Sequence, residues 1–97
     1  MATFITLIRF TKEGITNIKD GPQRLDQARQ AFKAMGAEMH AFYLTMGQYD
    51  AVVIGEAPDD ETAAKLALAI GSQGAVKTET LRAWTEEEYR KIIGALP

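Results

Sequence analysis

The sequence predicts a single α+β domain whose elements follow the order strand, helix, strand, strand, helix, strand, with one further helix at the end. Its 97 residues suffice for one domain and not for two. Segments with strand spacing alternate with segments of helical spacing, and two strand-like runs near the middle are separated only by a short turn. Right-handed connections in both halves of such a chain give the ferredoxin-like sandwich, an antiparallel four-stranded sheet with helices on one face.

The first half of the chain predicts a strand followed by a broken helix. Residues 3–10 form the strand, and because apolar side chains occur on both of its faces, we expect it in the centre of the sheet. Thr11 is the predicted N-cap of a short helical turn, and Pro22 fits the first position of the longer helix that follows. Gly36 is the predicted C-terminal cap of that helix.

The middle of the chain predicts a β-hairpin. Two runs rich in β-branched and aromatic residues flank the dipeptide Gly47-Gln48, and a break that contains glycine is typical of a hairpin turn. We assign the second strand to residues 37–46 and the third strand to residues 50–57.

The second half closes with a helix, a strand and a helix. Asp59 or Asp60 caps an alanine-rich helix, and residues 76–84 alternate in the way that favours an edge strand. Thr85 and Glu88 have the spacing of a capping box at the start of the last helix. The apolar side of that helix consists of Tyr89, Ile92 and Ile93.

Composition excludes several classes of function. The net charge is −2 with both signs spread along the chain, so no basic patch predicts a nucleic acid or a membrane as a partner. The absence of cysteine removes disulfides, thiol catalysis and thiolate metal sites, and it fits a reducing compartment. The first apolar run is short and has no basic segment before it, so we expect a cytoplasmic protein without a signal peptide.

One face of the predicted sheet has no helix to cover it, although several strands carry apolar residues on both sides. Exposed apolar patches larger than roughly a few hundred Å² are rare on monomers. A two-fold contact needs only one self-complementary surface. We therefore expect a homodimer built sheet to sheet, or a higher oligomer of such pairs.

The turn and its surroundings resemble a known family. The segment Gly47-Gln48-Tyr49-Asp50 is similar to the signature of the GYD domain family, which is named for Gly, Tyr and Asp at this hairpin. Further similar segments, which extend over nearly the whole chain, are residues 7–11, 13–14, 42–46, 51–52, 56–60 and 78–83. The resemblance implies the fold of the dimeric α+β barrel proteins, which include isomerases, monooxygenases and stress-response proteins. A shared fold does not by itself imply an activity.

A first candidate site follows from placing the first and third strands side by side and parallel. The end of the second strand, the start of the third and the end of the fourth then meet, and they bring together Tyr43, Thr45, Tyr49, Asp50, Arg82 and Trp84. There a tyrosine could donate a proton, an aspartate could act as a base and an arginine could clamp an anion. In the structural alternative, Asp50 accepts backbone hydrogen bonds in the turn, Tyr49 covers the end of the sheet and Arg82 pairs with a carboxylate.

A second candidate site lies at the opposite end of the sheet, where we expect His40, Glu56 and Arg9 in one neighbourhood. His40 is the only histidine, and it could serve as a general base or as one metal ligand. One histidine with carboxylates at no ligand spacing is poor evidence for a metal, so we predict no metal and no cofactor. Thr78, Thr80 and Arg82 share one face of the fourth strand and could bind a ligand or face solvent or a subunit boundary.

Together these patterns favour an oligomeric α+β barrel protein that binds a small organic molecule in a pocket between sheet and helices. The candidate residues for a cofactor-free proton transfer or oxygenation are His40, Tyr49 and Asp50. The candidate ligand-binding residues are Arg9, Tyr43, Thr80 and Arg82. The alternative is a non-catalytic, self-assembling structural or regulatory module, and the sequence leaves open whether the protein is an enzyme.

Overall fold

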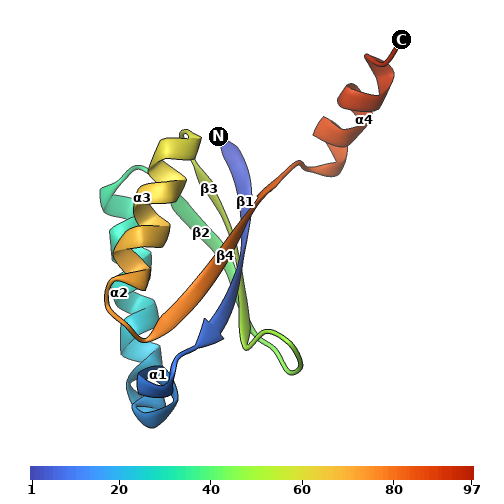
Figure 1. The fold of residues 1–97 in the computed structure, drawn as a ribbon. Helices are drawn as coiled ribbons and strands as arrows, with labels where there is room; N and C mark the ends of the chain where they lie inside the picture. The colour runs from blue at the N-terminus through green and yellow to red at the C-terminus, as the bar shows by residue number, and fades with distance from the viewer.

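The computed structural model describes all 97 residues and has the predicted order of elements (Figure 1). The strands are β1 (Ala2–Phe10), β2 (Glu38–Leu44), β3 (Ala51–Ala57) and β4 (Val76–Ala83). The helices are α1 (Lys12–Thr16), the 3-10 turn η1 (Ile18–Asp20), α2 (Gly21–Ala34), α3 (Asp60–Gly71) and α4 (Glu86–Gly94). The predicted α+β, ferredoxin-like fold class with a C-terminal helix is therefore confirmed. None of these helices combines the length and the hydrophobicity needed to cross a membrane.

The sheet has the strand order β2-β3-β1-β4, so the first strand is central as predicted. The expected parallel arrangement of the first and third strands is wrong, because Ala2 pairs with Ala57 and Ile8 with Ala51 in an antiparallel register. The physical reason is the path of the chain. The helical crossover makes β2 run in the same direction as β1, and the hairpin then reverses the chain, so β3 runs in the opposite direction. As a consequence, the end of β4 lies beside the start of β1.

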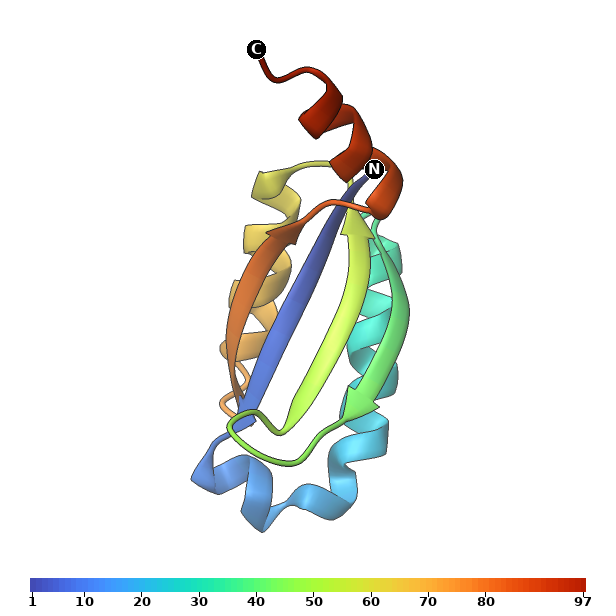
Figure 2. The same cartoon turned by 90° about the vertical axis from the view of Figure 1, so that its right-hand side faces the viewer.

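Helices cover only one face of the sheet. Helices α2 and α3 pack on that side, and the opposite side, called the open face below, has no helix over it (Figures 1 and 2). Only nine residues are buried, and a cavity lies between the two layers. Six of the seven buried apolar side chains form two small clusters, one of Ile8, Ala51 and Val53, the other of Ala37, Ala57 and Leu66.

Local hydrogen bonds explain where the first elements begin and end. The Thr11 hydroxyl accepts a bond from the Gly14 N–H at 3.1 Å and donates one to the Gly74 carbonyl at 2.6 Å, so the predicted cap also ties α1 to the segment that leads into β4. Gly36, the predicted cap of α2, has a φ of 74°, a conformation that favours glycine.

Asp59 is the residue that caps α3. Its carboxylate accepts a hydrogen bond from the Thr62 N–H at 2.8 Å. That bond stabilises the charged form, so it lowers the pKa of Asp59 below its ordinary value. The sequence left Asp59 and Asp60 as alternatives, and the structure selects the first.

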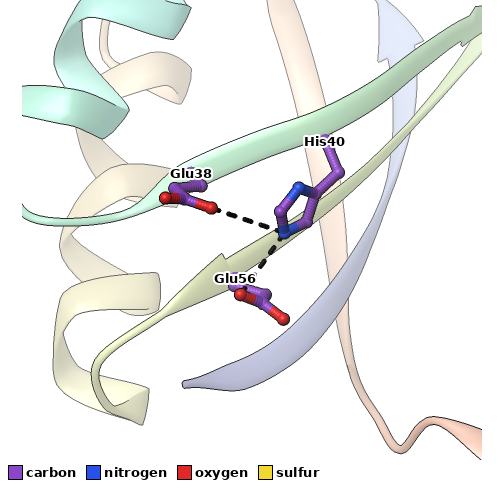
Figure 3. Close-up of side chains that lie close together, drawn as sticks. All are labelled: Glu38, His40 and Glu56. Carbon is purple, nitrogen blue, oxygen red and sulfur yellow. Dashed lines mark ion pairs between the residues drawn. The ribbon is translucent and has the colours of Figure 1, made fainter.

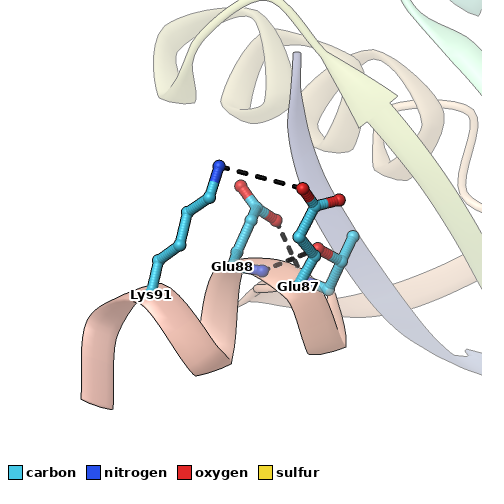
Figure 4. Close-up of polar contacts among 4 residues, drawn as sticks. Glu87, Glu88 and Lys91 are labelled. Carbon is cyan, nitrogen blue, oxygen red and sulfur yellow. Dashed lines mark hydrogen bonds and ion pairs between the residues drawn. The ribbon is translucent and has the colours of Figure 1, made fainter. Parts of the chain in front are cut away.

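Helix α4 extends away from the rest of the molecule (Figure 1). The predicted capping box is present, since Thr85 and Glu88 exchange side-chain-to-backbone bonds of 3.2 Å and 2.9 Å (Figure 4). The bond from the Thr85 N–H lowers the pKa of Glu88. An ion pair of 3.8 Å joins Glu87 to Lys91. The apolar side of this helix is exposed and consists of Tyr89, Ile92, Ile93 and, beyond the helix, Leu96.

Candidate functional site

The open face of the sheet carries an apolar band that crosses all four strands. The strand register aligns two neighbouring rows, one formed by Leu81, Ile5, Ile54 and Ala41, the other by Leu7, Val52 and Tyr43. We call these seven residues the apolar band. Leu81 and Tyr43 are 44% and 58% exposed, so no part of the chain covers the two ends of the band. Polar residues lie beyond both rows.

At the hairpin end of the band, the loop between β2 and β3 reaches across the sheet towards β4 (Figure 2). The Tyr49 hydroxyl donates a hydrogen bond of 2.7 Å to the Glu79 carboxylate. The guanidinium of Arg9 lies over the Tyr49 ring, 4.8 Å from its centroid. The bond to the negatively charged Glu79 raises the pKa of Tyr49 above its ordinary value. Tyr49 therefore stays protonated to a higher pH than an ordinary tyrosine, and its hydroxyl serves as the hydrogen-bond donor to Glu79.

Asp50, at the end of the same loop, is hydrogen-bonded to the backbone of β1. Its carboxylate accepts a hydrogen bond of 2.8 Å from the Phe10 N–H, and its own N–H donates one of 2.8 Å to the Ile8 carbonyl. The turn occupies residues 45–50, so β2 ends two residues before the predicted boundary. Gly47, with a φ of 116°, supplies a conformation that other residues rarely adopt. Asp50 thus accepts a backbone hydrogen bond, as the structural alternative predicts, but the donor is Phe10 at the end of β1 and not a residue of the turn.

At the other end of the band, Glu38, His40 and Glu56 lie together on the open face (Figure 3). The His40 Nε2 atom is 3.3 Å from Glu56 and 3.8 Å from Glu38. The expected neighbourhood of His40 and Glu56 is confirmed by these distances. Glu38 was missed, although its spacing of two residues from His40 on a strand is a signal that both side chains share a face.

The expected positions of the two strand arginines are exchanged in the structure. Arg9 lies at the hairpin end and not beside His40. Arg82 lies at the end of the sheet that carries His40, and not near Tyr49. The guanidinium of Arg82 donates to the carbonyls of Thr3, at 3.2 Å, and Ala83, and it stacks 4.5 Å from the centroid of Trp84. Both corrections follow from the antiparallel pairing of β1 with β3.

A cavity of about 440 Å³ separates the sheet from α2 and α3. Its walls are mainly apolar, and its polar groups include three threonines of the sheet, Thr6, Thr78 and Thr80. Among the candidate residues predicted from the sequence to bind a ligand or catalyse a reaction, Thr78 and Thr80 line this cavity. Those that do not line it are Arg9, His40, Tyr43, Tyr49, Asp50 and Arg82. The expected pocket therefore exists, but the strand register turns most of its expected lining residues elsewhere.

Comparisons with known proteins agree with this fold. A family model described as the GYD domain matches residues 4–93. The chain is 37% identical over 84 residues to the "Glutamine synthetase and cystathionine beta-lyase binding protein" of Thermus thermophilus, covering 86% of this chain and 88% of that protein. It is also similar to the crystal structure of TTHA0845 from Thermus thermophilus, with a TM-score of 0.56 and 25% identity. That alignment covers 88% of this chain and 95% of the other.

Proposed function

The chain belongs to the GYD domain family, and we propose that it is a non-catalytic protein-binding module that assembles with a second copy of itself through the open face. The observation that carries this proposal is the apolar band. Specific interfaces have an apolar core surrounded by a polar rim, and the band has polar clusters at both of its ends.

The state of the candidate catalytic residues supports binding over chemistry. The Tyr49 hydroxyl donates a hydrogen bond to Glu79, and the Asp50 carboxylate accepts one from the backbone N–H of Phe10 in β1. His40 lies at the other end of the sheet, beside Glu56. A general acid and base must both reach one reacting group, and none of these three side chains lines the cavity between the sheet and the helices.

The similar protein from Thermus thermophilus supports the proposal that this chain binds other proteins. That protein is named for binding two enzymes, and the similarity covers most of both chains. We therefore extend the proposal to a regulatory or scaffolding role in which the assembled module binds another protein. The exposed apolar side of α4 is a second surface suited to such contacts.

A pair of leucine substitutions tests self-association. Leu81 lies in the apolar band, whereas Leu68 lies on α3 and is 74% exposed. Light scattering coupled to size-exclusion chromatography should give a mass of at least two chains for the wild type and for Leu68→Lys. Leu81→Lys should shift the mass towards one chain, because a buried lysine at the interface would be unpaired. A wild type that runs as a 10.7 kDa monomer at micromolar concentration would refute the proposal.

The cavity favours a second candidate function, the binding of a small organic molecule. Its volume lies within the range of about 300–1,000 Å³ that is typical of ligand pockets. The mainly apolar walls suit an apolar or aromatic molecule, and the Thr80 hydroxyl could bind one polar group of it. Since the candidate catalytic residues lie outside this cavity, the proposal concerns binding and not a reaction.

A thermal-shift screen with small aromatic and carboxylate metabolites tests this second function. Ala28 lines the cavity, and Ala34 is an exposed residue of the same helix. A stabilising ligand should lose its effect in Ala28→Phe, which fills the cavity, and keep it in Ala34→Phe. A ligand shift that persists unchanged in Ala28→Phe would place binding elsewhere, and a flat screen would favour the module without a ligand.

A further inference from the structure

We propose that Glu38, His40 and Glu56 form a binding site for a divalent transition-metal cation of the Zn²⁺ class. Each residue offers one ligand atom, and the three atoms lie within 4.8 Å of one another on the open face (Figure 3). The prediction of no metal rested on spacing along the chain. The pairing of β2 with β3 brings in a third ligand that is distant in sequence, because Glu56 lies on the neighbouring strand β3.

The distances between the ligand atoms fit a small cation. Zinc binds histidine nitrogen and carboxylate oxygen at about 2.0–2.2 Å, so two ligands at a tetrahedral angle lie ~3.3 Å apart. The His40 Nε2 atom is 3.3 Å from the Glu56 oxygen and 3.8 Å from the Glu38 oxygen. The three ligand atoms lie within 4.8 Å of one another, so the exposed Glu38 side chain must rotate towards the other two to complete a set of three ligands around one ion.

The charges at this site also favour a cation. Glu38 and Glu56 are direct partners across the antiparallel strands, and like charges in that position repel each other. The imidazole of His40 is the only basic group that forms an ion pair with either carboxylate, and it is charged only when protonated. A divalent cation neutralises both carboxylates and uses the neutral imidazole as its third ligand.

The backbone places the three residues beside one another. The register between β2 and β3 shifts between Met39 and Ala41, so His40 is the extra residue of a β-bulge in an edge strand. Bulges redirect side chains and are frequent near functional sites. Gly55 lets β2 approach closely, since a Cβ atom at this position would lie 2.7 Å from the Glu38 carbonyl oxygen.

The ligand set defines the chemical class of the ion. An imidazole nitrogen with two carboxylates suits Zn²⁺ and similar transition metals, whereas Mg²⁺ and Ca²⁺ prefer oxygen ligands alone. Three protein ligands on an exposed surface leave at least one coordination position for water or an external group. The site therefore resembles open zinc sites rather than closed structural ones.

Isothermal titration of tag-free protein with ZnCl₂ tests the proposal, with MgCl₂ as the comparison ion. The expected result is saturable Zn²⁺ binding at one ion per chain that excess Mg²⁺ does not displace. His40→Ala and Glu56→Gln should each weaken Zn²⁺ binding at least on the order of tenfold. Removing a residue that only hydrogen-bonds to a metal ligand already lowers metal affinity about 10–100-fold. Glu61→Gln, an exposed carboxylate on α3, is the matched control and should bind as the wild type does.

A second readout covers the case in which a variant fails to fold. His40 is the only histidine, so its ring resonances in an NMR spectrum of the wild type are unambiguous. Stoichiometric Zn²⁺ should shift them, and equal Mg²⁺ should not. Absence of saturable Zn²⁺ binding, ring resonances that do not move, or equal affinity in folded His40→Ala would each overturn the proposal.

Discussion

Gly55 in β3 offers a perturbation whose magnitude follows from the structure. A methyl group in Gly55→Ala would lie 2.7 Å from the Glu38 carbonyl oxygen and 3.2 Å from a ring carbon of Phe32. Ordinary carbon–oxygen contacts begin at about 3.3 Å, so the first contact is too short by about 0.6 Å. Phe32 can rotate slightly, but the carbonyl belongs to the backbone of β2 and can move only with the strand.

The expected cost of Gly55→Ala is that of an overpacked interior, about 1–3 kcal/mol in the free energy of unfolding. In a domain of this length, 1 kcal/mol shifts the melting temperature by roughly 4–8 °C. Urea denaturation and thermal melts at one fixed protein concentration measure both quantities, because self-association makes stability depend on concentration. Displacement of β2 also moves Glu38, so Zn²⁺ binding should weaken in the same variant.

Gly71→Ala is the matched control, since no atom lies within 4 Å of a Cβ atom at this helical position. It should leave stability unchanged or raise it by up to about 1 kcal/mol. If Gly55→Ala were as stable as the wild type, the close approach of β2 to β3 at the bulge would be refuted.

Three further changes test other parts of the structure. Gly14→Ala should destabilise the fold strongly, because its Cβ atom would collide with the backbone of Ala75, and a melting temperature equal to that of the wild type would contradict the docking of α1 beside the start of β4. Because the pKa of Tyr49 is raised in the folded state, the contribution of Tyr49 to the free energy of unfolding is fully present below about pH 10. This contribution is lost as the pH rises through the raised pKa. The unfolding midpoint should therefore fall more steeply above about pH 10 in the wild type than in Tyr49→Phe, and parallel curves would contradict the bond to Glu79. Because the pKa of Asp59 is lowered in the folded state, the contribution of Asp59 to the free energy of unfolding is present above about pH 4. This contribution is lost as the pH falls through the lowered pKa. Denaturation experiments should thus show that Asp59→Asn loses less stability than the wild type between about pH 5 and about pH 2. The same dependence of stability on pH in both proteins would rule out this role of the cap.

Local signals explain why much of the fold was predictable from the sequence. The caps at Thr11, Gly36 and Thr85 depend on hydrogen bonds or backbone angles within a few residues, and all three occur as predicted. The central place of β1 followed from apolar residues on both of its faces. Such features need no knowledge of distant contacts.

The candidate site was less predictable because it depends on strand direction and register. Reversing β3 relative to β1 exchanged the neighbours of Arg9 and Arg82. The bulge at His40 arises from the pairing of β2 with β3 and has no signature within β2. The volume of the cavity likewise depends on the distance of α2 and α3 from the sheet. The spacing of apolar residues along the sequence does not predict this distance.

Thiol labelling measures whether a second protein chain covers the open face in solution, as we propose. The chain has no cysteine, so Tyr43→Cys in the apolar band and Leu68→Cys on α3 each introduce a single thiol, and both positions are exposed in the isolated chain. At micromolar concentration the thiol at position 43 should react on the order of tenfold more slowly than that at position 68, and dilution should remove the difference. Equal labelling rates at all concentrations would contradict a covered open face.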